Sequence, residues 1–146
     1  MPDTYLVEFD RALAQTLDDL ALGLYKPTGV YTAAESTIAL PAILTGGPDL
    51  PTTLDNCLVL NQQDSIVDGR ANLTHRVQII SRLKGTRNDS RNLAWALFMA
   101  LDHKEQIPAG FNISWSWRFS ELHTNKDSNA RYTVYQNFWF RGRRPL

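Results

Sequence analysis

The sequence of 146 residues contains one cysteine, Cys57, and its longest unbroken apolar run covers only residues 93–101. One cysteine excludes an internal disulfide and a zinc site built on several thiolates. A membrane-spanning helix needs roughly 20 apolar residues, so we expect no membrane segment. Residues 1–4 show no basic stretch followed by an apolar run, so we also expect no secretory signal. These absences predict one globular chain made in a reducing cytoplasm.

The motifs of common catalytic and ligand sites are missing as well. Residues 45–48, Thr-Gly-Gly-Pro, lack the Lys-Ser or Lys-Thr of a phosphate loop, and Gly-x-Ser-x-Gly does not occur. The three histidines, His75, His103 and His123, show neither HxH nor HxxxH spacing, so no metal site is predicted. We therefore expect a protein that is not an enzyme and has no cofactor.

Each side chain that could serve as a reactive group has a structural interpretation instead. Asp102 and His103 are adjacent at a predicted helix end. Neighbouring side chains of a helix point about 100° apart, so the carboxylate is not expected to face the imidazole as it would have to in order to orient a catalytic base. His75 is predicted to be a buried, hydrogen-bonded histidine, and Cys57 an inert buried thiol. His123 falls in a loop without partners nearby in sequence. A small ligand-binding or hydrolytic domain using residues 102–103 stays an alternative.

Charge is balanced overall but divided along the chain. Lys plus Arg and Asp plus Glu number 15 each, and the lack of a basic excess argues against a free-standing nucleic-acid binder. Residues 1–73 carry three cations against ten acids, a balance of −7, whereas residues 74–146 carry twelve against five, a balance of +7. Either the two halves mix in one fold, or the acidic and basic faces of neighbouring copies meet head to tail and close into a ring.

Two helices are predicted from apolar spacing. The first covers residues 4–22, begins at Asp3 or Thr4 and stops at Gly23; its apolar stripe comprises Leu6, Phe9, Leu13, Leu17 and Leu20, with Asp10, Asp18 and Asp19 on a solvated face. The second covers residues 89–103, with Asn88 or Asp89 as cap. Its apolar residues 93–101 occupy all sides of the helix. We therefore expect these side chains to be buried either by the first helix and the sheet together or by a neighbouring copy of the chain.

Alternating patterns predict the strands. They are expected at residues 36–44, where Pro41 places the strand at a sheet edge, and at 57–60, 73–84, 111–119 and 132–140, with an irregular edge over 24–31. On the strand 73–84, Arg76, Arg82 and Lys84 share the wet face. The last two strands are predicted to form a hairpin with a long loop at 121–129. Their aromatic residues could stack on bases, but their regular alternation favours a buried sheet face.

Helix, several strands, helix and two strands form the predicted order. This order is typical of an α+β fold, with an antiparallel or mixed β-sheet and two main helices packed on one face in a single domain.

Three stretches of the sequence are similar to those of a known family. The first is residues 23–35, where a Pro-x-Gly-x-Tyr-Thr element follows the N-terminal helix. The second is residues 77–89, where a strand ends in Gly-Thr-Arg and leads into the second helix. The third is the aromatic strand 131–140 followed by Arg143-Arg144-Pro145. In this order and spacing, the chain resembles the tail terminator proteins of phages with long, non-contractile tails, also described as tail completion or minor capsid proteins.

The resemblance implies one terminator-like domain over residues 1–146 that closes into a ring, usually six-fold, at the head-proximal end of the tail tube. Such a ring ends tube polymerisation, offers the surface that joins the head connector, and leaves a channel through which DNA passes without sequence-specific binding. It implies a virion location after assembly in the host bacterial cytoplasm. A head-completion or adaptor protein of the same neck is the alternative within the virion.

The candidate contact residues are cations. We expect contact surfaces on the strand face of Arg76, Arg82 and Lys84 and on the basic tail at Arg141, Arg143 and Arg144. Within the matching Gly-Thr-Arg stretch, Asp89 is expected as a cap or first-turn acid and Arg87 as an ion-pair donor, within the chain or toward a neighbour. No membrane partner is expected.

Overall fold

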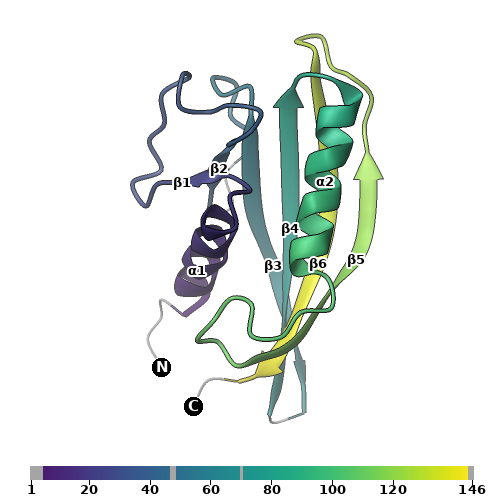
Figure 1. Cartoon of the computed structure of the whole chain (residues 1–146). Helices are drawn as coiled ribbons and strands as arrows, with labels where there is room; N and C mark the ends of the chain where they lie inside the picture. The colour runs from purple at the N-terminus through teal and green to yellow at the C-terminus, as the bar shows by residue number, and fades with distance from the viewer. Residues whose placement is uncertain (1–4, 47–48, 70, 145–146) are drawn as a thin grey trace.

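The computed structural model describes residues 5–46, 49–69 and 71–144, which form a layer of two helices on a six-stranded sheet (Figure 1). The predicted starts of the first helix, Asp3 and Thr4, lie outside these residues. The elements are α1 Tyr5–Asp19, β1 Leu24–Tyr25, β2 Ala42–Leu44, β3 Cys57–Asp68, β4 Asn72–Lys84, α2 Arg87–Leu101, β5 Ile113–His123 and β6 Arg131–Arg143.

The sheet is mixed, with the strand order β1-β2-β3-β4-β6-β5. The short strands β1 and β2 run parallel to each other and to β3, and all other neighbours are antiparallel. Both helices contribute to one apolar cluster on one face, with α1 over β1 and β3 and α2 over β4, β6 and β5 (Figure 1). The predicted α+β class, with a mixed sheet and two helices on one face, is confirmed.

Helix α1 ends earlier than predicted. The chain leaves the helix after Asp19, and Ala21 adopts a φ of 59° before the strand at Leu24 begins. The centre of the predicted stripe is buried as expected, but its two ends, Leu6 and Leu20, are nearly half exposed. The prediction that Asp10 lies on a solvated face is wrong: its residue is 7% exposed and its Oδ1 has no hydrogen-bond partner among the described residues.

Helix α2 begins at Arg87, and Thr86, rather than Asn88 or Asp89, is its cap. The Thr86 hydroxyl accepts a hydrogen bond from the Asp89 N–H at 3.1 Å, and the Asp89 carboxylate accepts one from the Thr86 N–H at 2.9 Å. This reciprocal pair is a capping box, which satisfies N–H groups that the helix itself leaves free. Asp89 is therefore a first-turn acid, as expected.

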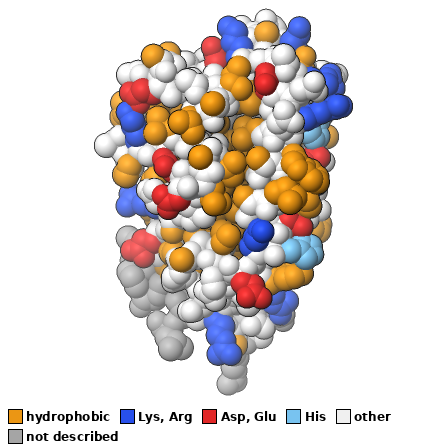
Figure 2. Space-filling model, viewed as in Figure 1, with side chains coloured by type: hydrophobic (Ala, Val, Ile, Leu, Met, Phe, Trp, Pro, Cys, Tyr) orange, Lys and Arg blue, Asp and Glu red, His pale blue; other side chains and the backbone are white. Residues whose placement is uncertain are grey.

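Only one face of α2 is covered within the chain. Ser90, Ala94, Leu97 and Leu101 are buried, whereas Trp95 is 61% and Met99 54% exposed. Of the two alternatives expected for this helix, enclosure by α1 and the sheet together is not found, because α1 lies over the other half of the sheet. Figure 2, which faces the helices, shows hydrophobic side chains over α2 and in a band between the two helices.

Three strand predictions need correction. The strand expected over 36–44 is reduced to Ala42–Leu44, because Pro41 lacks an N–H and the residues before it form turns. Strand β3 continues eight residues beyond the predicted end at Leu60, to Asp68, because its polar continuation pairs with β4 through backbone groups that need no apolar pattern. Strand β5 reaches His123, so the loop expected at 121–129 is shorter.

The two halves of the chain occupy opposite halves of the sheet. Elements α1 and β1 to β3, from the acidic half, lie on one side, and β4 to β6 with α2, from the basic half, lie on the other. The division of charge along the chain thus becomes a division across the molecule.

Candidate functional site

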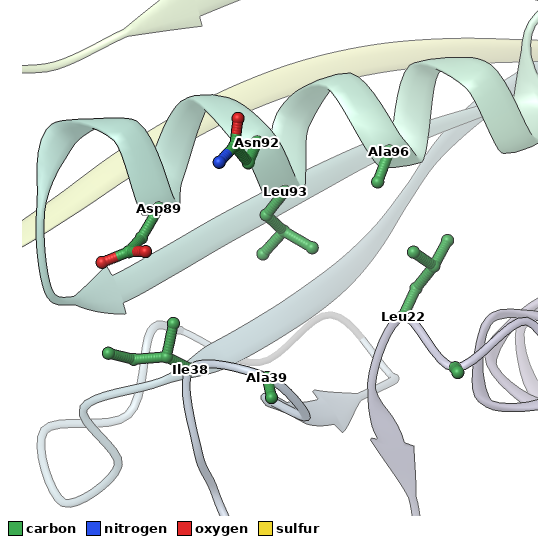
Figure 3. A pocket seen from close by; sticks show the side chains of 8 residues that line it. Leu22, Ile38, Ala39, Asp89, Asn92, Leu93 and Ala96 are labelled. Atoms are coloured by element: carbon green, nitrogen blue, oxygen red, sulfur yellow. The ribbon is translucent and has the colours of Figure 1, made fainter.

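Two surface hollows flank α2, one on each side. The first, called the α1–α2 groove, lies between α2 and the segments that follow α1, and measures about 260 Å³. Its lining residues come from the turn after α1, from the loop before β2 and from α2: Ala21, Leu22, Ile38, Ala39, Asp89, Asn92, Leu93 and Ala96. Leu22 and Ile38 lie across the groove from Leu93 and Ala96 (Figure 3). Apart from Asp89 and Asn92 its lining side chains are apolar, and hydrogen bonding from Thr86 holds the pKa of Asp89 below its usual range. The groove is therefore suited to apolar contact.

The α2–β5 hollow lies on the other side of the helix and is more polar. It measures about 360 Å³ and is lined by Arg91, Ala94, Trp95, Arg118, Glu121 and His123. Its charged groups contact one another: Arg118 Nη1 lies 2.5 Å from Glu121 Oε2, and His123 Nε2 lies 2.9 Å from Glu121 Oε1. His123 thus ends a strand beside a carboxylate, which corrects its predicted place in a loop without partners.

Packing fixes the Arg118 side chain in this hollow. Its guanidinium lies 4.1 Å from the centre of the Phe98 ring and donates to Gln136 Oε1 at 3.0 Å. An aromatic ring, an amide oxygen and a carboxylate thus hold the cation at the floor of the hollow.

Asp102 and His103 face each other, which corrects the argument from helix geometry. The helix ends at Leu101, and His103 has a φ of 55°, so its Nδ1 comes within 2.6 Å of Asp102 Oδ2. The other oxygen, Oδ1, accepts the backbone N–H of Arg118 at 2.8 Å. Neither residue lines the α1–α2 groove or the α2–β5 hollow. The pair therefore fastens the end of α2 to the outer edge of β5.

The same edge is closed further along by the residues after the helix. The Ser116 N–H donates to the Lys104 carbonyl at 3.0 Å, and the Ser116 carbonyl accepts the His103 N–H at 2.7 Å. The Gln106 N–H donates to the Ile113 carbonyl at 2.8 Å. Residues 103–106 and Asp102 thus occupy backbone groups that an edge strand otherwise offers to another chain.

His75 and Cys57 are buried, as predicted. The His75 ring stacks on Phe9 at 4.0 Å, and its Nε2 lies 3.3 Å from the Tyr5 hydroxyl. Burial lowers the pKa of His75 to about 4 and raises the pKa of the Cys57 thiol. Across residues 5–46, 49–69 and 71–144, no three His, Cys, Asp or Glu side chains gather as a metal site requires.

The predicted cationic residues do not form one surface. Lys84 and Arg87 lie at one end of the sheet, while Arg141, Arg143 and Arg144 lie where β6 pairs with the beginning of β4, about 40 Å away at the usual rise per residue. Arg76 reaches back to the Asp64 carbonyl at 2.5 Å. Arg87 lies over the Tyr132 ring at 5.5 Å, a contact that charge patterning alone does not indicate.

Arg82 is not on a wet face. It is 5% exposed, and its guanidinium donates to the carbonyls of Pro51 and Leu54. The segment that contains these residues covers part of the helix-free face, over a small cluster of Cys57, Val59 and Ile80. The expectation that Arg82 projects toward a partner is therefore corrected: within this chain it holds the 51–54 segment.

The aromatic side chains of β5 face away from the helices. Two irregularities in its pairing with β6, after Ile113 and after Arg118, shift the alternation, so Ser116 points to the core in place of an aromatic residue. Phe119 is 62% exposed and stacks on Trp139 at 4.7 Å. The expectation of a buried aromatic face is wrong for β5, although Phe138 and Phe140 of β6 do lie in the core.

Comparison with known proteins gives a likeness in structure. No protein-family model and no curated protein sequence matches the chain. A solved structure described as "Virion of native gene transfer agent (GTA) particle" contains a similar chain, with a TM-score of 0.65 and 16% sequence identity. The match covers 92% of this chain and 94% of that one. It shows a shared fold over nearly the full length of both. Neither described helix is long and apolar enough to cross a membrane.

Proposed function

We propose that this protein is a structural component of a phage-type virion, which forms a ring at the head-proximal end of the tail tube. In that position it ends tube polymerisation and provides the surface that joins the tail to the head. The observation that carries the proposal is the nearly complete fold match to a chain of a gene transfer agent virion. Among virion components, the order of the three terminator-like stretches at 23–35, 77–89 and 131–145 favours the tail terminator.

The arrangement of charge supports ring formation. The acidic and basic halves of the chain occupy opposite halves of one sheet, toward its β1 edge and its β5 edge. When copies stand side by side in the same orientation, the acidic half of one copy therefore lies beside the basic half of the next. Contacts between two different surfaces of one chain close into a ring when the rotation between copies permits. We propose a ring of identical subunits, six by the resemblance, around a channel through which DNA passes without sequence-specific contacts.

The two separated groups of cations support a role between two partners. Lys84 and Arg87 lie at one end of β4, and Arg143 and Arg144 at the other. We propose that one end contacts the tail tube protein and the other the head–tail connector, with Arg76 and Arg141 as further contact residues. In this role the protein acts by surface fit, without a catalytic step or a cofactor, and it resides in the virion after assembly in the host cytoplasm.

Electron microscopy of particles made without this protein tests the role. A missing terminator gives tails of irregular, excessive length that are not joined to heads. A missing head-completion protein instead gives tails of normal length beside unjoined heads. Tails of normal length already fixed to capsids would refute both roles. Complementation with the intact gene is the control.

A further inference from the structure

We propose that the α2–β5 hollow, with Trp95 at its rim, receives helix α1 of a second copy of this chain. This assignment rests on the proposed function and specifies which surfaces of the subunit meet in the ring. Trp95 belongs both to the lining of the hollow and to the apolar surface that its own chain leaves open.

The exposed surface of α2 carries the first part of the argument. Trp95 and Met99 lie one helical turn apart and are each more than half exposed, so they form an apolar ridge along the helix. Such side chains are covered in many assemblies, because their burial removes apolar surface from water. The neighbouring hollow provides room beside this ridge for side chains of another helix.

Charge indicates what covers the ridge. Arg87 and Arg91 against Asp89 give α2 a balance of +1. In the lining of the hollow, Arg91 and Arg118 against Glu121, the ion-pair partner of Arg118, also give +1. Apart from the buried Asp10, helix α1 carries three acids, Glu8, Asp18 and Asp19, against Arg11, a balance of −2. It also leaves Leu6 and Val7 nearly half exposed. An acidic helix with apolar side chains at its surface fits a basic hollow with an apolar rim.

The position of the two surfaces makes this contact a repeating one. Both helices lie on the same face of the sheet, α1 over one half and α2 over the other (Figure 1). Placing α1 of one copy beside α2 of the next continues a single helical layer from subunit to subunit. A contact between two α2 surfaces instead brings Arg91 of one copy toward Arg91 of the other, which like charge disfavours.

Part of the outer edge of β5 is closed to another strand. Along Ile113 to Arg118 the outer backbone groups of β5 are bonded to Asp102 and residues 103–106. A neighbour that approaches this side therefore meets the Trp95 ridge and the α2–β5 hollow, and it cannot simply extend the sheet along that stretch.

Two variants, each damaging one of the two surfaces, test the proposal by native mass spectrometry. Trp95→Lys changes the α2 surface, and Leu6→Lys with Val7→Lys changes the α1 surface. Each alone, with or without tube protein, is expected to lose assembly by roughly tenfold or more, since a lysine then faces like charge or apolar surface. Mixed in equal amounts, the two are expected to form a heterodimer and nothing larger, because one intact contact remains between them.

The control is Val67→Lys. Val67 is 55% exposed, close to the 54% of Met99, but it lies near the end of β3, a central strand of the sheet. It is expected to assemble like the wild type, and circular dichroism checks that all variants are folded. If both surface variants assemble as well as the wild type, the proposed ring remains supported, but this assignment of its contact surfaces is overturned. A dimer of the α1 variant with itself points to an α2–α2 contact and also overturns it. A wild type that stays monomeric with and without tube protein overturns the proposed function itself.

Discussion

The Arg82 guanidinium donates a hydrogen bond to the carbonyl oxygen of Leu54, 28 residues earlier in the chain, from a position that is 5% exposed. The same nitrogen also donates to the Pro51 carbonyl. A residue that sequence patterning assigns to an open face thus holds a covering segment against the sheet.

Replacing Arg82 by Met is expected to release the 51–54 segment. The loss of charge-assisted hydrogen bonds to one buried and one partly buried carbonyl should lower the free energy of unfolding by about 2–3 kcal/mol. Urea unfolding measures the loss, and thermolysin should cleave faster between residues 50 and 56. Arg76→Met, on the same strand face but less buried, is the control; an equal effect there would contradict the assignment.

The buried carboxylate of Asp10 contributes less stability at neutral pH than in mild acid. Burial raises the pKa of Asp10 from 3.8 to about 6, so the folded state favours the protonated form. Stability from this group is fully present below about pH 4 and is lost as the pH rises through 6. Asp10→Asn should therefore raise the free energy of unfolding at pH 7, by at most about 3 kcal/mol, with a gain that shrinks toward pH 4.

Thermal unfolding from pH 4 to 8 measures this gain. The matched control is Asp19→Asn, which changes an exposed carboxylate on the same helix. A gain of the same size and pH dependence at Asp19 would show that burial of Asp10 is not the cause.

His75 acts in the opposite direction. Burial lowers its pKa from 6.5 to about 4, so the folded state favours the neutral ring. Stability from this group is present above about pH 6.5 and is lost as the pH falls toward 4, by at most about 3 kcal/mol. His75→Phe, which can keep the stacking on Phe9, should flatten the loss of stability in acid, as measured by urea unfolding at pH 4.5 and 7. An equally steep loss of stability in acid for His75→Phe and the wild type would contradict this assignment.

Asp102 is expected to stabilise the edge of β5. Asp102→Ala removes the acceptor for the Arg118 N–H and should lower the free energy of unfolding by about 1–2 kcal/mol. Hydrogen exchange at the Arg118 amide should become faster. Asp102→Asn keeps an acceptor oxygen and should restore most of the loss, whereas His103→Ala should have little effect. A large loss in His103→Ala with none in Asp102→Ala would reverse this assignment.

Local patterns predict the elements well where one face of an element is buried against the core. Strand β4, Asn72–Lys84, differs from the predicted 73–84 by one residue, because its alternation reflects real burial of His75, Val77 and Ile79. The apolar run locates helix α2, although its cap is Thr86. The α+β class follows from the order of these elements.

The errors arise where distant parts of the chain decide the outcome. Whether Arg82 is exposed to solvent depends on the segment at Leu54, 28 residues earlier in the chain. The role of Asp102 depends on the backbone amide of Arg118, 16 residues later. The inward positions of β5 depend on two pairing irregularities with β6, which move Trp117 and Phe119 to the helix-free face. Neither hydrophobic period nor residue type encodes these relationships, so they could not be read from the sequence.

The occupied edge at Ile113 to Arg118 has a consequence for how large an assembly can become. An edge strand with free backbone groups can pair with the same strand of another chain, which again leaves a free edge, and fibrils grow without limit in this way. Where those backbone groups are already hydrogen-bonded within the chain, the angle between neighbouring subunits is set by the packing of their side chains. A few substitutions on such a surface could then change the number of subunits in a turn while leaving the subunit fold intact.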